Sequence, residues 1–120
     1  MSKKILCVDD SSTIRMLVKK SLEPAGYEIV EAENGKDALG KCSDAVDLYL
    51  VDVNMPEMDG FEFVRELQKT SYGKDKPIVF LTTESSAEKK EMGKNLGVKG
   101  WIVKPFEPPA LLKIVDMLTG

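Results

Sequence analysis

Short runs of apolar residues alternate along this chain with stretches in which apolar residues recur every three or four positions. Uninterrupted apolar runs are typical of parallel strands buried on both faces, and the wider spacing is typical of amphipathic helices. Because ligands bind outside the carboxyl ends of parallel strands, polar side chains at the ends of such runs are expected to gather at one edge of a sheet. The runs at residues 5–8, 48–51, 78–81 and 101–103 lead into Asp9 and Asp10, Asp52, Thr82 and Lys104.

The pattern predicts five strands, each followed by a helix. Asn34, Asp59 and Ser85 are the expected N-terminal caps of the second, third and fourth helices. Pro108 and Pro109 fall in the first turn of the last helix, where proline is tolerated. The predicted strands cover residues 5–8, 27–31, 47–51, 78–81 and 100–103, and the predicted helices cover 14–22, a segment after Asn34, 61–67, 87–95 and 108–118.

Five such units predict an α/β fold, a doubly wound (βα)5 domain whose parallel sheet has helices on both faces. The common five-stranded version is flavodoxin-like, with strand order 2-1-3-4-5. That order places the first and third strands side by side. Asp9, Asp10 and Asp52 would then line one crevice, with Thr82 and Lys104 on the strands beyond.

Length and composition fit a single domain over residues 1–120. The chain is 42% hydrophobic and 31% charged, as in ordinary globular domains. Its net charge of −3 argues against nucleic acid as a partner, because phosphate backbones favour basic surfaces. No apolar stretch approaches the roughly 20 residues of a membrane span, and no signal-peptide pattern is present. We expect a cytoplasmic protein without a membrane partner.

The chain has no histidine and two cysteines, Cys7 and Cys42. Their spacing does not suit zinc, and they are expected to be reduced thiols that pack as small apolar residues. Without histidine, serine–histidine and cysteine–histidine catalysis are excluded. If the protein handles phosphate through histidine chemistry, the histidine belongs to another protein.

The predicted acid cluster indicates a Mg²⁺ site. Two carboxylates roughly 4 Å apart repel by about 4 kcal/mol at an effective dielectric near 20, so three of them favour a bound cation. Mg²⁺ binds to one or two carboxylates with water and phosphate, whereas Ca²⁺ needs more oxygen ligands than this pattern offers. An aspartate beside Mg²⁺ can act as a nucleophile on phosphorus. Taken singly, the acids could instead cap a helix or end a strand, and Lys104 could be a solvated charge.

Four motifs together resemble the receiver domain of bacterial two-component signalling, of the single-domain chemotaxis regulator (CheY-like) type. The resemblance covers about residues 4–118. The motifs are Val8-Asp9-Asp10-Ser11, Asp52-x-Asn54-Met55-Pro56-x-Met58-Asp59-Gly60, Phe80-Leu81-Thr82 and Lys104-Pro105-Phe106.

The resemblance implies a role for each site residue. Asp52 would accept the phosphoryl group, and Mg²⁺ would be bound by Asp10, Asp52 and the backbone carbonyl of Asn54. Asp9 would act on the metal largely through water. The remaining implied roles are those of Thr82 as the switch hydroxyl, Lys104 as the ion-pair partner of the phosphoryl group, Asn54 and Glu84 as residues that tune phosphate lifetime, and a cis peptide bond before Pro105.

Two positions depart from the usual family pattern. Thr83 stands where a small residue is common, and Trp101 stands where most relatives have Tyr, Phe or His. The bulk of Thr83 could slow access to Asp52. The larger indole of Trp101 could limit the ring movement that accompanies switching, or hold the ring in one position.

The region around the fourth helix is the expected output surface. Gly93 costs this helix about 1 kcal/mol relative to Ala, and switching elements come from the less stable parts of a fold. The surface has a basic cast that suits an acidic partner segment, although a solvated helix face explains the charges equally well. The lysines concerned are Lys89, Lys90, Lys94 and Lys99.

The resemblance implies a signalling protein, not an enzyme with a separate substrate, although it would catalyse its own phosphorylation and dephosphorylation. Its partners would be a histidine kinase of the CheA type, the flagellar motor switch or another output protein, and a phosphatase; a monomer is expected. The alternatives are a phosphorelay shuttle, a phosphate sink and a phosphorylation-independent adaptor. A Mg²⁺-dependent phosphohydrolase of the haloacid dehalogenase type is disfavoured, because Asn54 stands where such enzymes need an acid.

Overall fold

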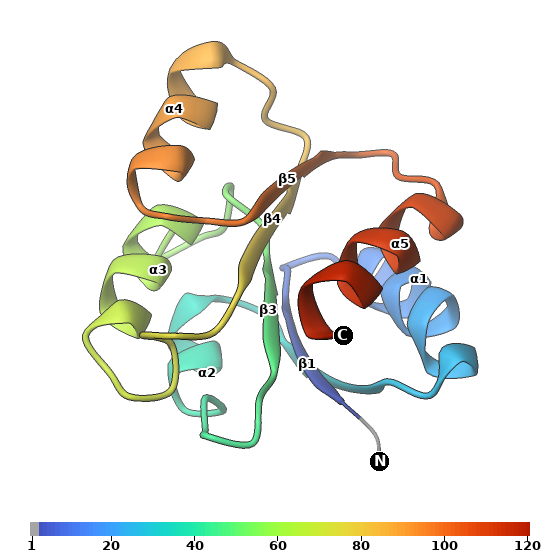
Figure 1. Ribbon diagram of the computed structural model, residues 1–120. Helices are drawn as coiled ribbons and strands as arrows, with labels where there is room; N and C mark the ends of the chain where they lie inside the picture. The colour runs from blue at the N-terminus through green and yellow to red at the C-terminus, as the bar shows by residue number, and fades with distance from the viewer. Residues whose placement is uncertain (1–2) are drawn as a thin grey trace.

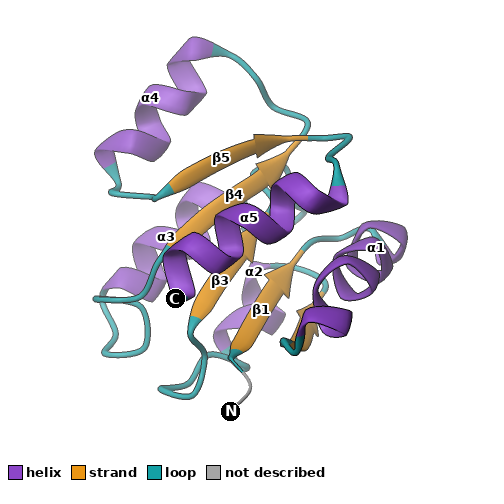
Figure 2. Ribbon diagram, turned by 45° about the vertical axis from the view of Figure 1, so that its right-hand side comes forward, coloured by secondary structure: helices purple, strands orange, loops and turns teal. Residues whose placement is uncertain are grey.

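The computed structural model, which describes residues 3–120, has five parallel strands in the order β2-β1-β3-β4-β5 with helices on both faces (Figures 1 and 2). The predicted doubly wound fold is confirmed. The strands are β1 (Lys4–Val8), β2 (Glu28–Ala32), β3 (Leu48–Val51), β4 (Ile78–Thr82) and β5 (Gly100–Val103). The helices are α1 (Ser12–Leu22), η1, a 3-10 turn (Glu23–Ala25), α2 (Gly35–Leu39), α3 (Gly60–Gln68), α4 (Ala87–Asn95) and α5 (Pro108–Thr119).

Alternate residues along the central strands supply two separate core layers. Leu6, Tyr49 and Phe80 pack on one face with α2 and α3. Cys7, Leu50 and Val79 pack on the other face with α1 and α5. This division follows from the pleat of a strand, which directs successive side chains to opposite faces. Both faces are covered, which is why the strands read as continuous apolar runs.

Three predicted strands were wrong by one residue at their amino ends: β1 begins at Lys4 and not at residue 5, and β2 and β3 each begin one residue later than predicted. β2 begins at Glu28, because the amide of Tyr27 donates to the carbonyl of Leu22 (3.4 Å) as the chain leaves α1 and η1. β3 begins at Leu48. The side chain of Asp47 accepts a hydrogen bond from the Lys4 amide (2.8 Å), so Asp47 anchors the start of the sheet without joining the strand.

The predicted cap of the fourth helix was also wrong by one residue. Ser86, not Ser85, caps α4, and its hydroxyl accepts a hydrogen bond from the amide of Lys89 (3.2 Å). The predicted caps Asn34 and Asp59 are confirmed, each accepting from the amide three residues on. Two neighbouring serines can both serve as a cap, so their sequence alone does not decide between them.

The described helices include none that is both long and apolar enough to span a bilayer.

Candidate functional site

The register of the sheet brings the ends of distant strands level with one another. Val8 lies opposite Val51, so Asp9 and Asp52 are the first residues beyond a matched pair. Thr82 lies opposite Val103 in the same way, directly before Lys104. All these residues are therefore at the carboxyl edge of the sheet, as predicted.

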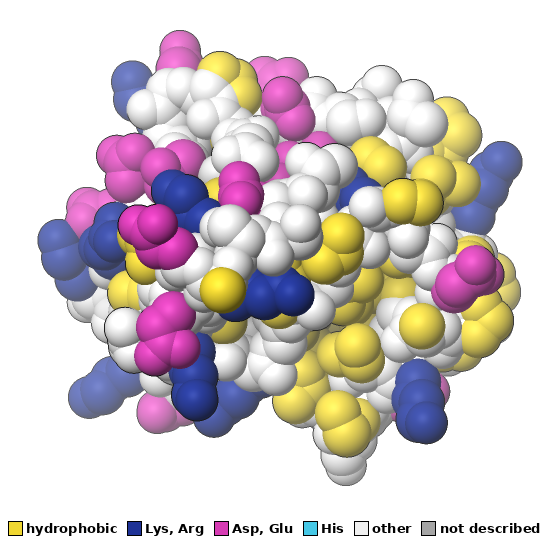
Figure 3. Space-filling view, turned by 90° about the horizontal axis from the view of Figure 1, so that it is seen from above, with side chains coloured by type: hydrophobic (Ala, Val, Ile, Leu, Met, Phe, Trp, Pro, Cys, Tyr) yellow, Lys and Arg dark blue, Asp and Glu magenta, His cyan; other side chains and the backbone are white. Residues whose placement is uncertain are grey.

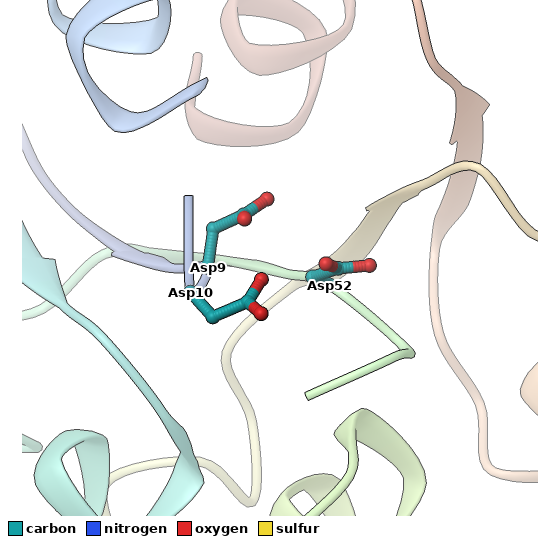
Figure 4. Close-up of side chains that lie close together, drawn as sticks. All are labelled: Asp9, Asp10 and Asp52. Carbon is teal, nitrogen blue, oxygen red and sulfur yellow. The ribbon is translucent and has the colours of Figure 1, made fainter. Parts of the chain in front are cut away.

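Three carboxylates converge at this edge (Figure 4). One carboxylate oxygen from each of Asp9, Asp10 and Asp52 lies within 4.8 Å of the other two. The carboxylates of Asp9 and Asp10 extend toward the side on which Asp52 lies. Asp9 and Asp52 are buried, with 2% and 6% exposure, whereas Asp10 is exposed to solvent. The cluster is thus anchored in the interior and open on the side of Asp10.

Lys104 is the cation that partly balances these charges. Its Nζ lies 2.6 Å from Oδ2 of Asp9 and 3.4 Å from Oδ2 of Asp52. The Lys104 side chain is 10% exposed, so water has little access to the two ion pairs. With all four groups ionised, three carboxylates and one ammonium leave a net charge of −2.

Burial raises the pKa of Asp9 above its ordinary value of 3.8. The hydrogen bonds from Lys104 and from the Ser11 amide act in the opposite direction but do not outweigh it, and the charge of Asp52 adds to the increase. Desolvation disfavours the charged form of a carboxyl group. Ionised Asp9 is therefore a costly group that a further cation would stabilise.

The residues present fit a Mg²⁺ ion. The site offers hard oxygen donors, and its net charge of −2 is the charge that a divalent cation neutralises. Carboxylate, carbonyl and water ligands suit Mg²⁺, while zinc favours the sulfur and imidazole ligands that this site lacks.

The loops after β1, β3 and β4 all begin with the same local turn. In each turn, one side-chain oxygen accepts a hydrogen bond from the amide two residues on. This side chain belongs to the first loop residue after β1 and β3, and to the last strand residue of β4. The three bonds are Ser11 N to Asp9 Oδ1 (2.9 Å), Asn54 N to Asp52 Oδ1 (3.3 Å) and Glu84 N to Thr82 Oγ1 (3.2 Å). Such turns are typical of Asp and Thr, and here they hold the polar oxygens at the sheet edge.

Gly60 is required by a close approach at the start of α3. A Cβ atom at this position would lie 2.3 Å from the backbone oxygen of Asp52. The Gly60 amide donates to the carbonyl of Val53 (2.8 Å), and Asp59 caps the helix. The helix therefore begins directly against the strand end that carries Asp52.

Arg15 is a site residue that sequence reasoning missed. Its Nη1 donates to the backbone carbonyl of Asp9 (2.5 Å), and its Nε pairs with Glu31 (3.0 Å). The guanidinium thus ties α1 and β2 to the backbone of the acidic segment. The spacing of Arg15 from the buried residues Val18 and Leu22 places it on the inner face of α1, and this signal could have identified it.

Trp101 packs inward against two aromatic rings. Its ring centroid lies 5.3 Å from that of Phe80 and 6.3 Å from that of Phe61. Its Nε1 donates to the backbone carbonyl of Glu84 (2.9 Å), in the loop that begins at Thr82. A Cβ at Gly93 would lie 3.1 Å from Cζ3 of the indole, so the helical glycine makes room for the ring.

The other predicted site residues fall at different places. Thr83 and Asn54 are exposed near the cluster, and the peptide bond before Pro105 is cis.

The surface over the carboxyl edge has charged side chains mainly on the side of α2, α3 and α4, and apolar ones mainly on the side of α1 and α5 (Figure 3). Three of the predicted output lysines, Lys89, Lys90 and Lys94, lie on α4. The fourth, Lys99, precedes β5 at the edge of the sheet opposite the acidic cluster.

A doubly wound sheet with a cluster of carboxylates at its switch point defines a class of α/β domain that binds its ligands at this edge of the sheet. Residues 5–116 match the family described as the response regulator receiver domain. The chain belongs to this family.

Similar proteins extend the same likeness over almost the whole chain. Chemotaxis protein CheY1 of Helicobacter pylori is 38% identical over 120 residues, which cover 98% of this chain and 97% of that protein. A Chemotaxis protein CheY homolog of Campylobacter jejuni is 40% identical over 121 residues, with 98% and 92% covered. The solved structure of Vibrio cholerae chemotaxis protein CheY4 superposes with a TM-score of 0.92 at 48% identity and covers 98% of this chain and 99% of that one.

Proposed function

We propose that residues 1–120 act as one receiver domain that is phosphorylated on Asp52 and thereby switches its binding to a partner protein. The observation that carries the proposal is the meeting of three carboxylates with the Lys104 ammonium at the carboxyl edge of the sheet. Asp52 is central to this arrangement, because its carboxylate is buried yet shares the site with exposed Asp10.

The transfer is a displacement at phosphorus. An Oδ of Asp52 forms a bond to the phosphorus atom, and the bond to the donor's nitrogen or oxygen breaks, so that the leaving group departs with the electron pair. Asp10, Asp52 and the backbone carbonyl of Asn54 would hold Mg²⁺, and Asp9 would act on it through water. When bound, this ion neutralises charge on the phosphoryl oxygens. Lys104, now paired with Asp9 and Asp52, provides the second positive charge.

Switching follows from the charge that the phosphoryl group adds, roughly two negative units. In our proposal Lys104 pairs with the new oxygens, and the Thr82 hydroxyl donates to one of them. That hydroxyl now accepts from the Glu84 amide, and the Glu84 carbonyl accepts from Trp101. A shift of this loop would therefore reach the indole and, through Gly93, α4.

The inward position of Trp101 determines what this route requires. Because the indole already contacts Phe61, Phe80 and the loop carbonyl, phosphorylation needs to move the loop but not to draw in an exposed ring. Glu84 and Asn54, which follow Thr82 and Asp52 by two positions, would affect the lifetime of the phosphoryl group. Lys89, Lys90 and Lys94 on α4 remain our predicted contacts for an acidic partner segment.

We place this activity in chemotaxis, in the cytoplasm. The partners would be a histidine kinase, since this chain has no histidine of its own, then the flagellar motor switch or another output protein, and a phosphatase. The support is that relatives named as chemotaxis proteins match the chain over nearly its full length. We expect the protein to be a monomer that catalyses its own phosphorylation and dephosphorylation.

Intact-mass spectrometry after incubation with acetyl phosphate tests the first step. Wild type should gain one phosphoryl group only when Mg²⁺ is present, and Asp52→Asn should gain none. Asp44→Asn, an exposed aspartate away from the cluster, is the matched control and should behave as wild type. A phosphoryl adduct that survives in Asp52→Asn would show that another residue is the acceptor.

The output step needs a separate test. Binding of the phosphorylated protein to a motor switch component should increase relative to the unphosphorylated protein, and Thr82→Ala should lose the increase while keeping the adduct. Transfer of the phosphoryl group to a second histidine protein, without motor binding, would instead favour a phosphorelay shuttle or a phosphate sink.

A further inference from the structure

A second hollow lies at the edge of the sheet opposite the acidic cluster. It has a volume of about 510 Å³, and its walls are the end of α3, the loop into β4, the turn between α4 and β5, and the end of α5. The 5 residues of β4 separate it from the acidic cluster by roughly 16 Å. It is therefore a different site from the proposed phosphorylation centre. Its lining includes Gln68, Lys74, Lys76, Leu96, Lys99 and Leu118.

The rim of this cavity is strongly basic. Lys74, Lys76 and Lys99 line it, against a single lining carboxylate, that of Asp75. Within residues 3–120 none of these three lysines forms a salt bridge; the Nζ of Lys76 contacts only the backbone carbonyl of Asp44, at 3.4 Å. The chain as a whole has a net charge of −3, so this concentration of positive charge runs against its composition.

The backbone that carries the lysines is held in place. A Cβ at Gly73 would lie 2.3 Å from the Leu67 side chain, so this loop packs directly on α3. The Lys74 amide donates to Thr70 (3.2 Å), and the Lys99 amide donates to the carbonyl of Ile78 (2.7 Å). The backbone of the rim is therefore preformed, which removes part of the entropic cost of binding, while the exposed lysine side chains must still be ordered.

The wall between the end of α3 and the end of α4 is fixed by the side chain of Gln68. Gln68 Nε2 donates to the carbonyl of Leu96 (2.6 Å) and joins the end of α3 to the end of α4. The chain then turns at Gly97, which has a φ of +83°. This left-handed conformation suits glycine and directs the chain from α4 toward Lys99.

Four apolar residues also line the cavity, although polar groups make up most of its lining, and we call these four residues its floor. Ile78 is buried, and Leu96, Leu118 and Pro77 are half-buried around it. A volume of about 510 Å³ lies within the range of small-molecule sites and exceeds what a lone inorganic phosphate would fill. The complementary ligand has a flat apolar body for the floor and two or more negative charges for the lysines.

We propose that this cavity binds a small organic polyanion of the nucleoside di- or triphosphate class, with the base on the Ile78–Leu96–Leu118 floor and the phosphates at Lys74, Lys76 and Lys99. Phosphate oxygens would give these ammonium groups the ionic partners that residues 3–120 do not provide. The ligand would also bridge the loop before β4 and the end of α4. The site does not depend on phosphorylation of Asp52.

The test is a titration of the ¹⁵N-labelled full chain with ADP at low ionic strength, in EDTA so that no metal bridges the nucleotide to the acidic cluster. Amide shifts should saturate at residues 73–76 and 96–99, and the amides of Asp9, Asp10 and Asp52 should not move. Lys74→Gln/Lys99→Gln should weaken ADP binding roughly tenfold or more, because two cations near the phosphates are lost. Lys36→Gln/Lys113→Gln, the same change of charge at exposed positions elsewhere, should not.

Three results would overturn the proposal. One is the absence of saturable shifts at millimolar ADP. Another is an equal loss of affinity in both double variants, which would mean that only the net charge matters. The third is pyrophosphate binding as tightly as ADP, which would mean that the apolar floor contributes nothing. The lysines are mainly surface side chains, so thermal melts should show that all variants remain folded.

Discussion

Replacing Asp10 with Asn should stabilise the metal-free protein. Asp10 has two carboxylate neighbours, each with an oxygen within 4.8 Å of its own. Unlike Asp9 and Asp52, it has no ion pair among the described residues, so its removal relieves repulsion without breaking an attraction. The substitution leaves the side-chain volume almost unchanged and removes one negative charge.

The size of the effect follows from Coulomb's law. At 4.8 Å, each pair costs about 3.5 kcal/mol at an effective dielectric near 20, and about 1 kcal/mol in bulk water. Asp10 is exposed, so the lower value is closer, and salt screens it further. We expect Asp10→Asn to raise the free energy of unfolding by about 1–2 kcal/mol, or Tm by roughly 4–8 °C for a domain of this size.

The assay is thermal and urea unfolding in EDTA, repeated with saturating Mg²⁺. Wild type should gain stability with Mg²⁺, by about 2.7 kcal/mol at a hundredfold excess over Kd, and the variant should gain less, so their difference should shrink or reverse. Asp44→Asn is the control, since this exposed aspartate makes no side-chain hydrogen bond within residues 3–120. If Asp10→Asn stabilises the protein in EDTA no more than Asp44→Asn does, the acids do not repel as argued.

Three further predictions concern groups around the site. Burial raises the pKa of Asp9 above 3.8, so its contribution to stability is full below that value and is lost as the pH rises through the folded pKa. In EDTA, the unfolding free energy of wild type should therefore fall relative to that of Asp9→Asn as the pH rises, and a constant difference would contradict this. Gly93→Ala should give no stabilisation despite a helix-propensity gain of about 1 kcal/mol, because the new Cβ meets Trp101 at 3.1 Å, and the substitution should shift the tryptophan fluorescence. Gly40→Ala, whose new Cβ has its nearest contact at 3.5 Å, is the control. A more stable Gly93→Ala protein would refute the contact with Trp101. Burial raises the pKa of the Cys7 thiol to about 12, so at pH 8 a thiol reagent should modify Cys7 only upon unfolding, and rapid modification of the native protein would be inconsistent with its burial.

Much of the fold was predictable because the local patterns are strong. Strands buried on both faces leave continuous apolar runs, and the acids stand directly after them. Once five alternating units imply a parallel sheet, topology brings Asp9, Asp10 and Asp52 together. The errors were shifts of one or two residues at element ends, such as the start of α1 at Ser12 and the cap of α4 at Ser86 in place of Ser85.

The sequence by itself determined the elements, their order and the acidic site, since these depend on periodicity and on residues next to strand ends. Only the tertiary structure decided how distant side chains pair: Lys104 bridges Asp9 and Asp52, and Arg15 reaches the Asp9 carbonyl. It also decided that Trp101 lies inward and that Lys99, which precedes β5, lines a cavity together with Lys74 and Lys76. These contacts depend on strand register and on side-chain direction across the sheet, which no local pattern in the chain encodes.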